Sequence, residues 1–259
     1  MKLLLTILIT AVTSLSAMAQ KDTLKAGVYN WSNVKVVKSG GAEKRQVING
    51  KTGDLKVFDI YTLTLPAGKN YDLPVAENKF EKLIIVKSGN VTLTLNDSSK
   101  TIGYGSLALV LPGDQISFKN TSGAPATWYV INFESADPVN NKRGRDAGAS
   151  FIKDWNSLKI SKTEKGESRN VFNRPTAMFN LFDAHATALN SGYASHPPHV
   201  HRQEELILML TGSVQEHIGA GEFMANAGDC IYLSSGILHG PKNINSQQTY
   251  YYAIQWHRL

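Results

Sequence analysis

Three histidines and one glutamate in the C-terminal half of the sequence have the types and the spacing of metal ligands. One residue separates His199 from His201, Glu205 follows four positions later, and His239 comes from a distant segment. Side chains alternate across a strand, so the two histidines of a His-x-His pair face the same side, and Glu205 keeps that side if the strand continues. We therefore expect these four residues to converge on one metal ion.

The chemistry of this ligand set favours a divalent transition metal. Three neutral imidazoles and one carboxylate suit Mn, Fe, Co, Ni, Cu or Zn better than Ca or Mg, and they do not choose among the transition metals. Four protein ligands on an octahedral ion leave two positions for substrate, water or O2. This openness is typical of a catalytic site and not of a closed structural one.

Short strands must position these side chains. Apolar or alternating runs, bounded by Gly, Asn, Asp, Ser and Pro, cover residues 55–65, 83–86, 91–95, 107–111 and 128–133. Such runs predict an all-β chain. Residues 135–150 are polar, contain several glycines and asparagines, and are predicted to be a linker.

The two halves of the chain repeat one another. Residues 81–89 correspond to residues 204–212, and residues 128–133 correspond to residues 251–256, in the same order and at nearly the same spacing. Repetition of this kind predicts two copies of one β unit. We place the N-terminal unit at 20–134, the linker at 135–150 and the C-terminal unit at 151–259.

The motifs of the second half resemble those of the cupin superfamily. The matching positions are Gly192, His199, His201, Glu205 and Gly212 for the first motif, and Gly228, Asp229, Gly236, His239 and Asn243 for the second. The chain departs from the family at Asn226, where a proline is usual, and this position is not a ligand. The resemblance implies a bicupin, with two tandem double-stranded β-helix or jelly-roll barrels, and it assigns the metal to the four residues named above.

The first half lacks these ligands. In the same register Ala76, Asn78, Lys82 and Ile116 stand at the four ligand positions. Such a set cannot hold a metal, so we expect a metal-free N-terminal barrel. The sequence leaves open whether Lys82 places its ammonium where the metal would lie or turns outward.

The repeat also points to two candidate catalytic residues. His185 corresponds to Tyr61 and Glu216 corresponds to Leu93, so both polar residues are expected to face the barrel interior. Buried groups of this kind need partners, and beside a metal they are candidates for moving a proton. A register shifted by one residue would instead expose Glu216 and turn His217 inward.

The resemblance implies a metalloenzyme that acts on a small oxygenated substrate by dioxygenase-type or sugar- or uronate-converting chemistry. The metal would act as a Lewis acid or bind O2, while Glu216 or His185 moves a proton. Oxalate decarboxylases usually carry metal in both barrels, which disfavours that activity here. The alternatives are a non-catalytic, metal-dependent protein that binds a sugar or another small molecule, and a metal-stabilised storage protein.

The N-terminus predicts export. Lys2, the apolar run over residues 3–9 and the small residues Ala17 and Ala19 are typical of a signal peptide at residues 1–19, cleaved before Gln20. We therefore expect a periplasmic or secreted protein with no membrane span after cleavage.

Composition narrows the partners. Cys230 is the only cysteine, so no internal disulfide forms, and the net charge of +6 comes from scattered residues. No nucleic-acid-binding motif accompanies them, so we expect a small-molecule substrate and no nucleic acid. A bicupin chain already contains a barrel pair, and both a monomer and a homodimer remain open.

Overall fold

The computed structural model describes residues 23–258. The predicted signal peptide, residues 1–19, lies outside the described residues. Within them the chain forms 21 strands, one α-helix and two short 3-10 helices. No helix in this part of the chain is both long and apolar enough to cross a membrane.

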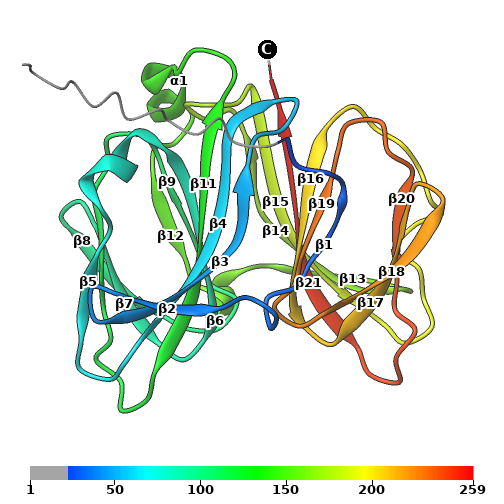
Figure 1. Cartoon of the computed structure of the whole chain (residues 1–259), viewed down its shortest axis with the longest axis horizontal. Coiled ribbons are helices and arrows are strands. Elements are labelled where there is room, and N and C mark those ends of the chain that lie inside the picture. Colours follow the sequence, from blue (N-terminus) through cyan, green and yellow to red (C-terminus); the bar gives the residue numbers. More distant parts are fainter. Residues whose placement is uncertain (1–22, 259) are drawn as a thin grey trace, which may run out of the picture.

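The strands form two barrels that lie side by side, each made of a seven-stranded sheet and a smaller one (Figure 1). The large N-terminal sheet contains β2 (Val36–Ser39), β3 (Ala42–Gly50), β4 (Leu55–Leu65), β6 (Glu81–Ser88), β9 (Leu107–Val110), β11 (Ala126–Ser135) and β12 (Phe151–Lys153). The small N-terminal sheet contains β5 (Asn70–Asp72), β7 (Val91–Leu95), β8 (Ser98–Ile102) and β10 (Ile116–Lys119).

The C-terminal barrel repeats this plan. Its large sheet contains β1 (Gly27–Tyr29), β13 (Ile160–Thr163), β14 (Gly166–Arg174), β15 (Leu181–Leu189), β16 (Glu204–Thr211), β19 (Cys230–Leu233) and β21 (Thr249–His257). Its small sheet contains β17 (Ser213–Ile218), β18 (Gly221–Asn226) and β20 (His239–Lys242). The helices are η1 (Val75–Lys79), α1 (Asn141–Asp146) and η2 (Trp155–Ser157). The prediction of an all-β chain with two tandem barrels is confirmed.

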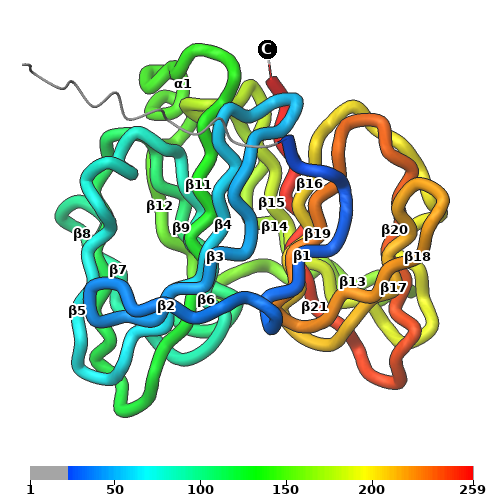
Figure 2. The backbone as a smooth tube through the Cα atoms, viewed as in Figure 1, coloured from blue at the N-terminus to red at the C-terminus, as the bar shows by residue number. Residues whose placement is uncertain are grey.

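The barrels exchange short strands, which the predicted boundaries did not anticipate. β1 pairs with β19 of the C-terminal barrel, and β12 pairs with β9 of the N-terminal barrel. Figure 2 shows the N-terminal segment passing from β1 on one barrel to β2 on the other. The division into 20–134, 135–150 and 151–259 therefore differs from the structure at these two strands, and α1 lies within the predicted linker.

The central strands are buried on both faces. In β6, Ile84 and Val86 fill the N-terminal barrel, whereas Leu83 and Ile85 pack between the barrels. In β16, the even-numbered residues from Leu206 to Leu210 pack between the barrels, while Ile207 and Met209 fill the C-terminal barrel. Burial on two sides explains why both strands are continuous apolar runs instead of alternating ones.

Candidate metal centre

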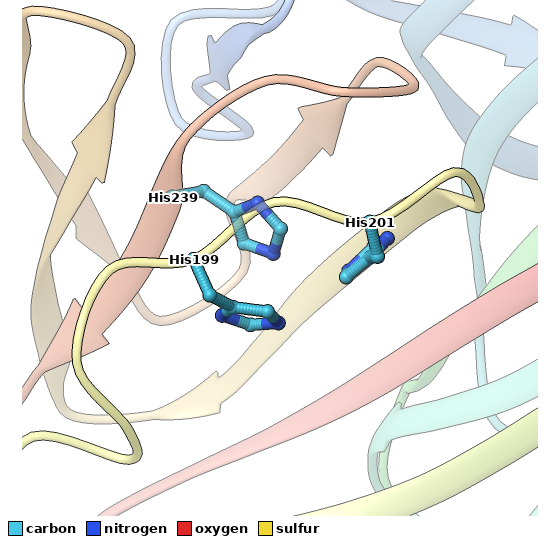
Figure 3. A group of neighbouring side chains, drawn as sticks. All are labelled: His199, His201 and His239. Atoms are coloured by element: carbon cyan, nitrogen blue, oxygen red, sulfur yellow. The ribbon is translucent and has the colours of Figure 1, made fainter.

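The backbone brings two of the predicted ligands together. His199 lies in the loop before β16 and His239 begins β20, and each backbone N–H donates to the carbonyl of the other residue at 3.0 Å. His201 follows two residues after His199 in the same loop. Figure 3 shows the three imidazole rings turned toward one another, and one nitrogen of each lies within 4.8 Å of the other two.

Glu205 completes the group from the second position of β16. Its Oε2 lies 3.1 Å from Nε2 of His201 and 3.3 Å from Nε2 of His239. The same oxygen accepts a hydrogen bond from Nε2 of Gln255 at 3.1 Å. The structure thus brings together the four residues that the spacing predicted, while their role as ligands stays a prediction.

The Nδ1 atoms of His201 and His239 fix the orientation of these two rings. Nδ1 of His201 lies 2.9 Å from the carbonyl of Gln203, and Nδ1 of His239 lies 3.0 Å from the carbonyl of Ile237. A carbonyl only accepts, so each Nδ1 carries a proton and each Nε2 faces Glu205. Each ring must then be either an imidazolium or a neutral ligand that binds a cation through Nε2, which is the usual arrangement at metal sites.

Buried atoms without hydrogen-bond partners support the same fit. Nδ1 of His199 and Nε2 of His239 are both buried and make no hydrogen bond to the residues that the structure describes. An unpaired polar atom in the interior costs free energy. Each of the three histidines offers one nitrogen to the common centre, beside the Glu205 carboxylate, so the donor set fits a transition-metal ion.

The electrostatics favour the ligating form of Glu205 and of His199, whereas the hydrogen bond to Glu205 raises the pKa of His201 and a metal would have to displace its proton. Burial alone would raise the pKa of Glu205, but the hydrogen bond from His201 and the positive charge of His201 and His239 outweigh it and lower that pKa to about 2. Burial and the neighbouring imidazoles His196 and His239 lower the pKa of His199. An ionised carboxylate and a neutral imidazole are the forms that bind a metal.

A cavity of about 210 Å³ adjoins these residues on the inner face of the barrel. Its wall consists of His185, Thr187, Ser195, His196, His199, Glu205, Ile207, Pro241, Tyr251, Ala253 and Gln255. Two of the expected ligands, His199 and Glu205, are part of this wall. A small molecule in the cavity would therefore lie against the metal centre.

His185 lies on the cavity wall, as the comparison of the repeats predicted. Its Nδ1 lies 2.8 Å from Oδ2 of Asp183, which precedes it on the same face of β15. Burial would lower the pKa of His185, but the hydrogen bond and charge of Asp183, with a contribution from Glu205, outweigh it and raise that pKa. The pair can hold and move a proton, although a catalytic role stays a prediction.

Glu216 also faces the interior but does not line the cavity. It is fully buried on the same face of β17 as Val214 and Ile218, opposite Pro241 of β20. Burial and the charge of Glu205 raise its pKa to about 9, so it is protonated at neutral pH. The register shifted by one residue does not occur, because His217 lies on the other face and contacts Glu222.

The sequence did not single out four of the residues around the cavity. Asp183 orients His185, Gln255 donates to Glu205, and Tyr251 lines the cavity. The ring of His196 stands perpendicular to that of His199, with centroids 4.1 Å apart. The repeat could have indicated Gln255, because Asn132 occupies the same place in the first barrel.

In the N-terminal barrel Lys82 takes the place of Glu205, and the absence of a metal there stays a prediction. Lys82 is buried, and its Nζ donates to the backbone carbonyls of Glu77 and Phe80 at η1. Burial lowers the pKa of Lys82 to about 8. Of the two orientations that the sequence left open, the structure has the inward one, with the ammonium satisfied by backbone carbonyls.

Comparisons with known proteins agree with this arrangement. Residues 187–255, which include the four expected ligands, match the family described as Cupin domain. No curated protein sequence matches significantly.

Solved structures with the same fold are distant in sequence. A protein named for its induction by glyoxylate, from Pseudomonas aeruginosa, has a TM-score of 0.74 at 14% identity, over 97% of this chain and 94% of the other. Lactobacillus farciminis oxalate decarboxylase in a formate complex has a TM-score of 0.69 at 14% identity, over 91% and 87%. Protein Ylba from E. coli has a TM-score of 0.69 at 15% identity, over 90% and 91%. At these identities the likeness shows the fold alone.

Proposed function

The chain belongs to the cupin superfamily, and we propose that its C-terminal barrel is a metal-dependent active site for a small oxygenated substrate. One observation carries the proposal. Oε2 of Glu205 lies 3.1 Å and 3.3 Å from the Nε2 atoms of His201 and His239, beside His199 and at the wall of a cavity.

The roles of the residues follow from their positions. His199, His201, Glu205 and His239 would hold one divalent transition metal, with Mn, Fe, Ni, Cu and Zn all compatible with the donors. A bound metal of this kind supplies Lewis acidity or redox chemistry. His185, oriented by Asp183, is the side chain on the cavity wall that would accept or donate a proton.

Glu216 has a different role in this proposal from the one that the sequence suggested. It is buried beside Pro241 of the neighbouring strand and does not line the cavity. Direct proton exchange with the substrate therefore belongs to His185, and Glu216 acts as a neutral carboxylic acid beside the metal centre. The size of the cavity favours a small acid or a similar compact molecule over a sugar chain, as a substrate for dioxygenase-type or isomerising chemistry.

The similar folds support a small substrate without identifying it. One of them is named an oxalate decarboxylase, and its structure holds formate. The N-terminal barrel of the present chain has Lys82 in place of a ligand, so a second metal is not part of this proposal. The proposed function also includes export to the periplasm or the medium, which the first 19 residues predict.

The second candidate is a non-catalytic protein that binds a small molecule at the same metal. The observation that favours it is that Glu216 does not line the cavity. The His185–Asp183 pair is then the main proton-transfer group there. Both candidates require the metal, and turnover separates them.

Elemental analysis of the purified mature protein tests the proposal. We expect close to one transition metal for each chain, and we expect the His199→Ala/His201→Ala double variant to lose it. Asn78→Ala is the matched control, because Asn78 takes the place of His201 in the first barrel. Two metals per chain, or a double variant that keeps the wild-type metal content, would contradict the assignment.

A further inference from the structure

The two barrels present the same three rows of side chains across their central strands. In each row the first residue comes from β4 or β15, the second from β11 or β21, and the third from β6 or β16. The rows Asp59–Asn132–Lys82, Tyr61–Val130–Ile84 and Leu63–Trp128–Val86 correspond to Asp183–Gln255–Glu205, His185–Ala253–Ile207 and Thr187–Tyr251–Met209. One barrel is thus an internal reference for the other.

The second and third rows show where the cavity comes from. In the N-terminal barrel all six residues of these rows belong to one buried apolar cluster. In the C-terminal barrel, alanine replaces Val130, threonine replaces Leu63 and tyrosine replaces Trp128. The three replacements, Ala253, Thr187 and Tyr251, all line the cavity. Smaller side chains therefore leave open the space that the first barrel fills.

Ala253 lies at the middle of this opening. It stands directly opposite His185 on one side and Ile207 on the other, and both neighbours line the cavity. A bulkier residue at this position would extend into the cavity between them, because side chains of neighbouring strands stand close together on one face. The methyl group of Ala253 is therefore the part of the cavity wall between His185 and Ile207.

The walls around Ala253 favour a compact molecule that accepts hydrogen bonds. Thr187, Ser195, His185 and Gln255 each carry a donor on or near the wall. At the roughly 30 Å³ that one water molecule occupies in the liquid, a cavity of about 210 Å³ has room for about seven groups of that size. A divalent metal with one carboxylate and three neutral imidazoles keeps a net positive charge, which favours an anion.

We propose that Ala253 is the specificity-determining residue of the site, and that it limits the ligand to a small oxygen-bearing anion of about seven non-hydrogen atoms or fewer. This inference rests on the proposed function, because the anion lies between the metal and the row of His185, Ala253 and Ile207. The residue determines size and does not ligate the metal.

The test uses the full mature chain loaded with Co(II), whose visible absorption reports changes at the metal. Formate, oxalate and citrate are titrated in order of increasing size, and elemental analysis gives the cobalt content. We expect formate and oxalate to change the spectrum and citrate to leave it unchanged. Ala253→Val should keep one cobalt per chain and weaken oxalate binding at least tenfold.

Two further variants distinguish an effect of cavity size on oxalate binding from an effect of misfolding. Val130→Ala makes the reverse change at the matching place in the N-terminal barrel and should bind oxalate like the wild type. Thr187→Leu, which also copies the first barrel, should weaken oxalate binding with cobalt retained, and it serves if Ala253→Val does not fold. Calorimetric unfolding identifies a variant that has lost its structure.

The outcomes that overturn the inference differ from those that overturn the proposed function. An Ala253→Val variant that holds cobalt and binds oxalate as the wild type does would overturn the inference. So would cobalt-loaded wild type that binds citrate, or that binds none of the three anions. A wild-type protein that takes up no cobalt would instead overturn the metal site itself.

Discussion

Two glutamates at matching positions of the repeat should respond to the same substitution in opposite ways. Glu81 and Glu204 open β6 and β16, and each side chain reaches toward the opposite barrel. Oε2 of Glu81 accepts from the backbone N–H of Met178 at 3.0 Å, while its Oε1 is buried without a hydrogen bond of normal geometry. Glu204 accepts from four donors, which are Thr52, the N–H of Gly53, Tyr232 and Trp256.

The pKa of Glu81 sets the size of the effect. Burial, which outweighs the hydrogen bonds from Thr176, Met178 and Ala177 and the charge of Arg143, raises this pKa from 4.5 to about 7. The folded-state pKa lies above the unfolded one, so the contribution of Glu81 to stability is complete below pH 4.5 and is lost as the pH rises through 7. At 1.36 kcal/mol for each pH unit, the loss approaches about 3 kcal/mol.

Glu81→Gln keeps the shape of the protonated acid and cannot ionise. We expect it to unfold at a similar urea concentration to the wild type at pH 5, and to be more stable by up to about 3 kcal/mol at pH 8.5. Glu204→Gln should lose stability at both pH values by about 2–4 kcal/mol, since an amide nitrogen cannot accept from the donors that surround it.

Urea unfolding of the wild type and both variants at pH 5 and pH 8.5 measures these differences. The midpoint of each transition gives the change in stability if the slope is unchanged. Equal pH dependence in wild type and Glu81→Gln would refute the raised pKa. A Glu204→Gln variant as stable as the wild type would refute the claim that four hydrogen-bond donors surround the Glu204 carboxylate.

Three predictions concern the metal centre directly. Glu205→Gln should lower metal affinity by at least the roughly 10–100-fold that loss of an outer partner costs, measured by competition with a chelator, and unchanged affinity would exclude Glu205 as a ligand. His185→Gln and Asp183→Asn should leave the metal content unchanged, and His185→Gln should slow turnover by about 10²–10⁴-fold, whereas loss of metal in either would place the pair among the ligands. Metal removal should lower the melting temperature. The affinity for the metal should fall as the pH drops below about 6.5, because protonated imidazoles do not ligate. An affinity for the metal that stays constant from pH 8 to pH 5 would contradict a site of three histidines.

The strand face on which each site residue lies could be predicted, because the alternation of side chains along a strand is a local rule. Glu205 and Ile207 share a face of β16, and His185 and Thr187 share a face of β15, whatever the loops do. The comparison of the two halves extended this rule to Glu216, which is buried as expected. Each of these predictions needed only the period of a strand and a correct register.

What lies across a barrel from a given residue could not be predicted in this way. Glu216 faces inward, but its neighbour Pro241 lines the cavity in its place. The direction of Lys82 depends on the carbonyls of η1, and strands as short as β1 and β12 carry no pattern that assigns them to a sheet. Such outcomes depend on packing between distant segments, which the strand period does not contain.

The two barrels differ in how they satisfy their polar atoms at and beside the ligand positions, and this difference favours a metal in one of them. In the N-terminal barrel, the amine of Lys82 donates to carbonyls of its own chain, and the hydroxyl of Tyr61 donates to Glu77 at 2.7 Å. The cost of burying these groups is thereby offset without a ligand. In the C-terminal barrel, Nδ1 of His199 is buried without a hydrogen bond to the described residues, and Nε2 of His239 has only the carboxylate of Glu205, 3.3 Å away. A metal ion that accepts lone pairs of these imidazoles would stabilise the second barrel. The first barrel has no imidazoles at the matching positions for such an ion to bind.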